Sequence, residues 1–246
     1  MNITVLTFDS LDSTNTEALK QARLGADEGL CIVAGEQTAG RGRHGRTWVS
    51  QKDAGLYFSI VLRPKINTKF LPVITLMTGV AVHDTLQDFG LKPDIKWVND
   101  VLIKEKKISG ILAETTETND GIAVVVGIGI NLKSSNFPPE IADIATSLES
   151  ETKVAATGNL AESLTKYLTY FYEILRSENG PAEIINEWRR RSSYFSGKAV
   201  RVVLENETIT GVTEGLEPNG ALRIRRENGE LAIIQAGDVE QLRSEL

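Results

Sequence analysis

Residues 35–48 read GEQTAGRGRHGRTW, with three arginines and one histidine among four glycines. Glycines let the backbone approach an anion, and arginine makes planar, paired contacts to phosphate or carboxylate. The stretch is not a P-loop, because Arg41 and Gly42 stand where that motif has lysine and serine or threonine. We therefore predict a cationic loop that closes on an anionic group. A solvated surface loop is the alternative that spacing alone leaves open.

The loop lies between two strand patterns, and the surrounding chain alternates strands and helices. Residues 30–35 and 55–64 read as long strands, and residues 95–132 read as a meander of shorter ones. Apolar residues at helical spacing predict helices over 70–89, 160–175 and 181–191. A capping-box pattern at residues 14–17 begins another helix, which should end at Gly25. The pattern is typical of the α+β class.

After Gly197 the pattern changes to strands alone. Residues 198–205, 208–216, 221–227 and 231–239 read as short strands, and PNG and ENG turns separate the later ones. We expect a small all-β module and place the domain boundary near residues 193–197, which gives domains 1–193 and 194–246.

The 246-residue chain has a net charge of −6, against which the cationic loop stands out. The acidic balance argues against a broad nucleic-acid or anionic-membrane surface, so the anion at the loop should be a small ligand. A single cysteine, Cys31, excludes an internal disulfide, and the chain has neither a secretory signal nor an 18-residue apolar run. We expect a cytoplasmic protein that binds no membrane.

Further motifs have ordinary structural interpretations. GIGIN at 127–131 lacks the third glycine of a dinucleotide fingerprint, so it suits a strand against which another group packs closely. KWVND at 96–100 is typical of a hairpin turn, and Lys107 is typical of an exposed strand start. His83 and Asp84 are expected to form a solvent-side pair on their helix.

The residue types also exclude some chemistry. Two histidines and one cysteine cannot build a structural zinc site, and no GxSxG elbow is present. Lysine, arginine and carboxylates remain, and these suit phosphoryl or nucleotidyl transfer, in which catalysis is mostly positioning and charge stabilisation.

Four segments, taken in order and spacing, resemble the biotin–protein ligases. They are Ser13-Thr14-Asn15, the loop 35–48, KWVND with KISGIL at 96–112, and GIGIN. The sequence departs from the family at Val98, where proline is usual. The resemblance implies a class II synthetase-like domain with a mixed sheet flanked by helices, and an SH3-like C-terminal β-barrel. The match begins near residue 9, so we expect the short, monofunctional class without a helix-turn-helix domain and without DNA binding.

The resemblance also implies an activity. Biotin and ATP, with Mg²⁺, would give biotinyl-5′-AMP, and the biotinyl group would pass to a lysine of a biotin carboxyl carrier protein or domain. It allows a homodimer through sheet edges. A lipoate or octanoate ligase of related fold and a non-catalytic biotin sensor are the alternatives. The intact loop and Lys107 favour the biotin ligase.

The family's pattern carries over residue by residue. The implied catalytic residues are Lys107 and Arg43, and Asp100 is the implied Mg²⁺ contact. The implied biotin-binding residues are Ser13, Thr14, Asn15, Gln37, Gly40, Arg41, Gly42, Arg43, Gly110 and Gly129. The implied ATP- or adenylate-binding residues are Arg43, Arg46, Trp48, Asn99, Asp100, Lys107 and Asn131.

The chemistry of such a reaction suits these residue types. A carboxylate and a triphosphate repel each other, so a cation between them lowers the barrier in a partly dry site. The mixed anhydride hydrolyses readily, so water must be excluded. We therefore expect the loop to act as a lid that is mobile and exposes Arg41, Arg43 and Arg46 until it orders around the adenylate.

Overall fold

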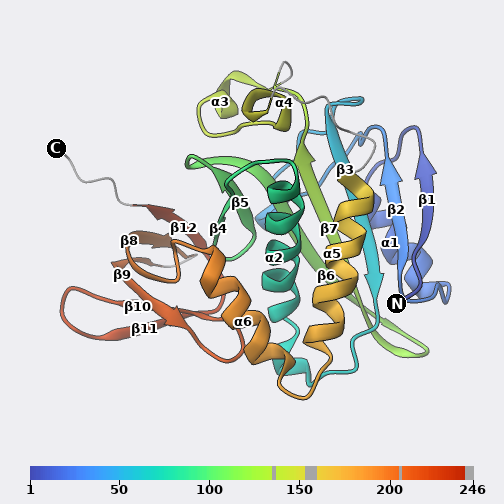
Figure 1. The fold of residues 1–246 in the computed structure, drawn as a ribbon. Coiled ribbons are helices and arrows are strands. Elements are labelled where there is room, and N and C mark those ends of the chain that lie inside the picture. The colour runs from blue at the N-terminus through green and yellow to red at the C-terminus, as the bar shows by residue number, and fades with distance from the viewer. Residues whose placement is uncertain (135–136, 153–159, 205–206, 242–246) are drawn as a thin grey trace.

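The computed structural model describes residues 1–134, 137–152, 160–204 and 207–241. A seven-stranded sheet forms the large domain (Figure 1). Its first two strands are parallel, and all other neighbouring strands are antiparallel. In spatial order the strands are β1 (Thr4–Phe8), β2 (Leu30–Ala34), β3 (Gly55–Leu62), β7 (Gly121–Asn131), β6 (Lys106–Thr118), β5 (Asp100–Ile103) and β4 (Asp94–Lys96). The mixed sheet that the resemblance implied is confirmed.

Helices cover both faces of this sheet. Helix α2 (Val73–Asp88), with α5 (Leu160–Leu175) and α6 (Gly180–Arg191), lies on one face, and α1 (Thr14–Arg23) lies on the other (Figure 1). Alternate residues of β3 enter different cores: Ile60 joins the large cluster with α2, and Val61 joins a smaller cluster with α1. The near-continuous apolar run of β3 follows from this double burial.

Helix α2 is buried on nearly all sides, so the expected solvent-side pair His83–Asp84 is wrong. Both residues are buried. Asp84 accepts two hydrogen bonds from Arg191 of α6, at 2.6 and 2.8 Å, and one of its oxygens lies 2.9 Å from His83 Nδ1. Burial acts to raise the pKa of Asp84, but the hydrogen bonds from His83 and Arg191 prevail and hold that pKa below its ordinary value.

The capping box is also wrong in detail. Ser13 precedes the first helical residue of α1 and makes no side-chain capping bond, while Glu17 accepts a hydrogen bond from Gln21 at 2.7 Å. This bond lowers the pKa of Glu17. The helix ends at Arg23, and Gly25 follows with a φ of 90°, as the sequence predicted.

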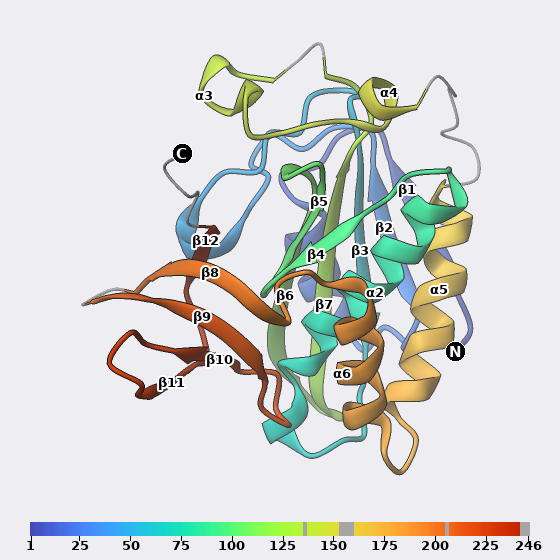
Figure 2. The ribbon, with the colours of Figure 1, turned by 60° about the vertical axis from the view of Figure 1, so that its left-hand side comes forward.

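The C-terminal module is an antiparallel sheet of five strands (Figure 2). In spatial order they are β11 (Leu231–Ile234), β10 (Leu222–Arg225), β9 (Thr208–Leu216), β8 (Ser196–Val203) and β12 (Asp238–Gln241). Within the described ranges β11 and β12 do not pair, so no closed barrel is seen. The buried indole of Trp97 donates to Gly220 O at 2.9 Å and ties the module to the large domain.

Several elements were not predicted from the sequence. They are β1, the short helices α3 (Pro139–Ala142) and α4 (Leu148–Glu151), and the 3₁₀ turns η1 (Arg43–Gly45) and η2 (Thr68–Phe70). Among the described residues, no helix has the length and apolar character needed to cross a membrane.

Candidate active site

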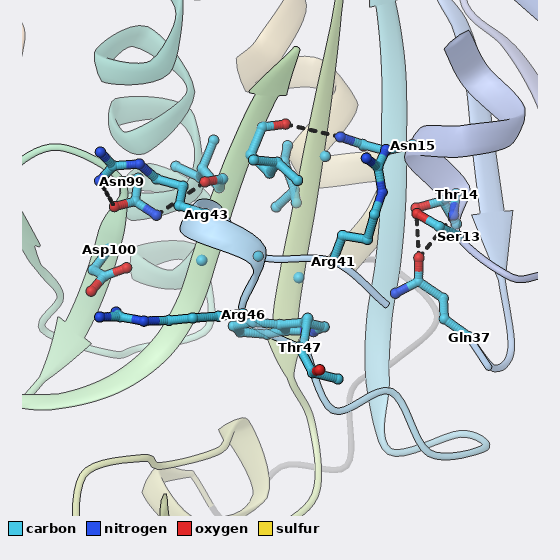
Figure 3. A pocket seen from close by; sticks show the side chains of 18 of the residues that line it. Ser13, Thr14, Asn15, Gln37, Arg41, Arg43, Arg46, Thr47, Asn99 and Asp100 are labelled. Atoms are coloured by element: carbon cyan, nitrogen blue, oxygen red, sulfur yellow. Dashed lines mark hydrogen bonds between the residues drawn. The ribbon is translucent and has the colours of Figure 1, made fainter. Parts of the chain in front are cut away.

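A cavity of about 140 Å³ opens on the α1 face of the sheet, beneath the loop 40–48 (Figure 3). Most of the site residues predicted from the sequence line this cavity, although they come from five separate segments of the chain. They are Ser13, Thr14, Asn15, Gln37, Arg41, Gly42, Arg43, Arg46, Trp48, Asn99, Asp100, Lys107, Gly110 and Gly129. Two nominated residues, Gly40 and Asn131, do not line this cavity.

Glycines in β6 and β7 make room for the side chains around the cavity. A Cβ atom at Gly129 would overlap the indole of Trp48, and one at Gly127 would overlap the amide of Asn15. Gly110 pairs with Gly129 across the two strands, and a Cβ there would crowd Trp48 as well as Lys107. The interpretation of GIGIN as a strand against which other groups pack is confirmed.

The loop is folded over the sheet, and protein carboxylates neutralise two of its three arginines. Arg41 forms a bidentate ion pair with Glu114 of β6, in which its two terminal nitrogens donate to the two carboxylate oxygens at 2.9 and 2.7 Å. Arg46 pairs with Asp238 of the C-terminal module. The positive charge of this loop is thus partly balanced within the chain. The expected mobility of the loop stays a prediction.

Arg43 differs from the other two loop arginines. Its guanidinium donates to Asn99 Oδ1 at 3.1 Å and to Gly237 O at 3.4 Å, and among the described residues it forms no ion pair with a carboxylate. Burial lowers the pKa of Arg43 from its ordinary value. The residue is therefore a half-buried cation that lines the cavity and keeps its charge for a ligand.

Lys107 is not the exposed strand lysine that the sequence suggested. Its Nζ atom lies 2.6 Å from Asp100 Oδ1, and the Lys107 side chain is 34% exposed. Lys96 Nζ is 3.6 Å from the other oxygen of Asp100. Oδ1 is buried and makes no hydrogen bond within the described residues, so the ammonium group of Lys107 is its close partner. Lys107 also lies 5.4 Å from the centre of the Trp48 ring.

Neutral polar groups form the other end of the cavity. Thr14 N donates to Gln37 Oε1 at 2.8 Å, and Gln37 Nε2 donates to Ser50 Oγ at 2.8 Å. Ser59 Oγ lies 2.7 Å from Thr14 Oγ1 and 2.6 Å from Asn15 Oδ1. Ser50 and Ser59 were missed from the sequence, although a serine inside the apolar run of β3 was a usable signal.

A second cavity, of about 610 Å³, adjoins the first. The two share part of their lining, namely Arg46, Thr47, Trp48, Asn99, Asp100, Lys107 and Asp238. The larger cavity adds an apolar surface formed by Phe137, Ile141, Ile144, Ala145, Tyr194 and Val239. The arrangement can hold two ligands that meet beside the ammonium group of Lys107.

The two nominated residues outside the first cavity have structural contacts. Asn131 lines the larger cavity, and its amide donates to Thr146 O at 3.0 Å and Lys107 O at 3.3 Å. Gly40 packs so closely on Trp48 O and Ser50 Oγ that a side chain would not fit there. Both residues thus support the cavity walls.

No group of three or more His, Cys, Asp or Glu side chains that could hold a metal ion occurs in the part of the chain that the structure describes. A magnesium ion carried by a nucleotide needs fewer protein ligands, because it keeps waters and phosphate oxygens. The carboxylate of Asp100, which lines both cavities, suits one such contact.

Comparison with known proteins agrees with this arrangement. Residues 7–131 match the Biotin/lipoate A/B protein ligase family, and residues 195–241 match the Biotin protein ligase C terminal domain. The chain belongs to the biotin/lipoate A/B protein ligase family.

Similar proteins carry related names. The chain is 35% identical to the Bifunctional ligase/repressor BirA of Bacillus spizizenii, over 94% of this chain and 72% of that protein. It is 33% identical to the Biotin--[acetyl-CoA-carboxylase] ligase of Paracoccus denitrificans, over 93% and 96%. The structure of the biotin protein ligase of Aquifex aeolicus in complex with biotin and ATP is similar, with a TM-score of 0.83 at 32% identity, and the match covers 98% of this chain and 99% of that one.

Proposed function

We propose that this protein is an ATP-dependent biotin–protein ligase. It converts biotin and ATP to biotinyl-5′-AMP and pyrophosphate. It then transfers the biotinyl group to a lysine of a biotin carboxyl carrier protein and releases AMP. The observation that carries the proposal is the pair of adjoining cavities whose shared wall contains Lys107. The similar Aquifex enzyme is described in complex with biotin and ATP, which are the two ligands that such a site requires.

In the first step, the biotin carboxylate attacks the α-phosphate of ATP. The ureido group of biotin is neutral and needs donors and acceptors, which Ser13, Thr14 and Gln37 supply in the smaller cavity. Lys107 and Arg43 offset the charge that builds up as carboxylate meets phosphate. For this, the ammonium group of Lys107 must leave its ion pair with Asp100 and contact the substrate anions instead.

The lining of the two cavities supports the residue assignments, except for Gly40, which lines neither cavity and would act through its close packing on Trp48 and Ser50. The biotin-binding set is Ser13, Thr14, Asn15, Gln37, Gly40, Arg41, Gly42, Arg43, Gly110 and Gly129. The ATP-binding set is Arg43, Arg46, Trp48, Asn99, Asp100, Lys107 and Asn131, in which Asn131 acts by fixing the wall of the larger cavity. Asp100 would contact the Mg²⁺ that accompanies ATP, and this ion would neutralise the departing pyrophosphate.

The second step needs a deprotonated carrier lysine and a site from which water is excluded until that lysine arrives. The folded loop covers the cavity and would limit hydrolysis of the anhydride. We assign catalysis to residues 1–193, and an SH3-like fold to residues 194–246. We also propose that the protein acts in the cytoplasm without a DNA target and as a homodimer through its sheet edges.

The test uses the purified protein with ATP, a carrier domain and either biotin or lipoate. We expect the adenylate and the labelled carrier lysine to form with biotin and not with lipoate. Adenylate formation with lipoate only would favour the lipoate ligase. Tight biotin binding without adenylate would favour a sensor.

A further inference from the structure

Glu114 lies on β6, the strand that also carries Lys107, and was not nominated by any sequence motif. Its two oxygens accept from both terminal nitrogens of Arg41, at 2.9 and 2.7 Å. One of these oxygens also accepts from Asn15 Nδ2 at 2.8 Å. A single carboxylate thus joins a cation of the loop to an amide on the wall of the smaller cavity.

This contact differs from an ordinary surface ion pair, which typically contributes little. Asn15 is buried, and its amide is fixed at both ends, because Nδ2 also donates to Leu112 O at 3.1 Å and Oδ1 lies 2.6 Å from Ser59 Oγ. The Glu114 side chain is itself only 25% exposed. The two parallel hydrogen bonds from Arg41 to Glu114 then fix the plane and the direction of the guanidinium group.

Carboxylate partners hold two of the three loop arginines and leave Arg43, among the described residues, without an ion pair. Glu114 holds Arg41 at one end of the loop, and Asp238 holds Arg46 at the other. Arg43 lies between them, half-buried and bonded to neutral oxygens. Without Glu114, Arg41 would be free to seek the same anion as Arg43, and that end of the loop would lose its anchor.

We infer that Glu114 is a positioning residue, which acts through Arg41 and Asn15 to hold the loop over the smaller cavity and so determines the apparent affinity for biotin. The link to biotin rests on the proposed function, but the link to the loop does not. The effect should appear in biotin binding and in loop protection, and not in the chemical step, since Glu114 does not line the cavity.

The test compares Glu114→Gln with Glu117→Gln, an exposed glutamate on the same strand. For Glu114→Gln we expect a rise of about tenfold in the KM for biotin, a kcat within about twofold of wild type, and trypsin cleavage at Arg41 to Arg46 about tenfold faster without substrates. Glu114→Asp, which keeps the charge, should restore part of each effect. Glu117→Gln should change none of them.

Two outcomes would overturn the inference. One is an unchanged rate of loop cleavage in Glu114→Gln, and the other is a fall in kcat as large as the rise in KM. The variant Arg41→Gln provides a double-mutant cycle for loop cleavage: if Glu114 holds the loop through Arg41, trypsin cleaves the loop of the double variant no faster than that of Arg41→Gln alone, whereas effects that multiply contradict it. A wild-type protein that forms no adenylate would refute the proposed function, while the cleavage comparison would still decide the role of Glu114.

Discussion

Lys107 and Asp100 form an ion pair between strands β6 and β5, with the ammonium nitrogen 2.6 Å from a carboxylate oxygen. Both residues line both cavities. In the proposed reaction, a substrate anion must therefore compete with Asp100 for the same ammonium group. The aspartate holds that group where the two cavities meet.

Replacing Lys107 with alanine should impair adenylate formation strongly. Loss of a charged contact in the transition state costs roughly 2–4 kcal/mol, or about 30-fold to 1,000-fold in rate. The free energy of unfolding should fall by about 1–2 kcal/mol, because Asp100 loses its close partner. Single-turnover adenylate formation and urea unfolding measure the two effects. Lys106→Ala is the matched control, since Lys106 is exposed on the same strand. A near-normal rate in Lys107→Ala would refute the catalytic assignment.

Replacing Gly129 with alanine should displace the indole of Trp48. The added methyl group overlaps the ring, so the variant should lose about 1–3 kcal/mol of stability through overpacking. In the Trp48→Ala background, which removes the clash, Gly129→Ala should cost much less stability, while adenylate formation stays impaired. Thermal unfolding of both single variants and the double variant provides the measurement. Independent, additive losses would show that the indole is not packed on Gly129.

Replacing Asp238 with asparagine should weaken ATP binding more than biotin binding. Arg46 would lose its carboxylate partner at the edge of the larger cavity. We expect the KM for ATP to rise roughly threefold to tenfold and the KM for biotin to change by less than about twofold. Pyrophosphate release at varied concentrations of each substrate measures both. Glu214→Gln, which removes an ion pair with Arg225 elsewhere in the same module, is the control. Equal changes in the two KM values would argue against the prediction.

The Asp84–Arg191 pair should make stability depend on acid pH. Because the folded-state pKa of Asp84 is depressed, its contribution is complete above the ordinary aspartate value of 3.8 and is lost as pH falls through the lower folded-state value. Asp84→Asn should therefore cost about 3 kcal/mol at pH 7 and progressively less as the pH falls below 3.8. Urea unfolding across this pH range tests the prediction. The control is the variant Asp120→Asn, because Asp120 lies exposed in a turn. A penalty that stays constant with pH would contradict it.

The spacing of apolar residues predicted best those helices that bury one face and expose the other. Helix α5 occupies residues 160–175, as its apolar spacing indicated, because it packs one face on the domain and exposes the other. The position of helix α2 was predicted but its burial was not, since it lies between a sheet and two helices and exposes little beyond its last residues, Gln87 and Asp88. Its buried Asp84 is satisfied by Arg191, 107 residues away, which no local pattern reveals. The edge strand β1 was missed because its residues are mostly exposed.

The candidate site shows the same division. The loop motif identified the loop arginines, and the resemblance to the family identified Lys107, which looked like an ordinary exposed strand lysine by itself. They did not identify Glu114 or Asp238, whose importance comes from the loop cations that they contact across long stretches of chain. Residues that act through others carry no signature of their own, and their partners appear only when the sheet register and the path of the loop are known.

Two glycines of β7 lie at a fixed interval along the wall of the site. Gly127 faces the amide of Asn15, and Gly129, two residues along the same strand, faces the indole of Trp48. The rise of a strand sets the interval between these positions at about 6.8 Å, and backbone hydrogen bonds to both neighbouring strands keep it from stretching. A ligand lying along β7 would therefore meet these two side chains at an interval that the backbone of the sheet determines.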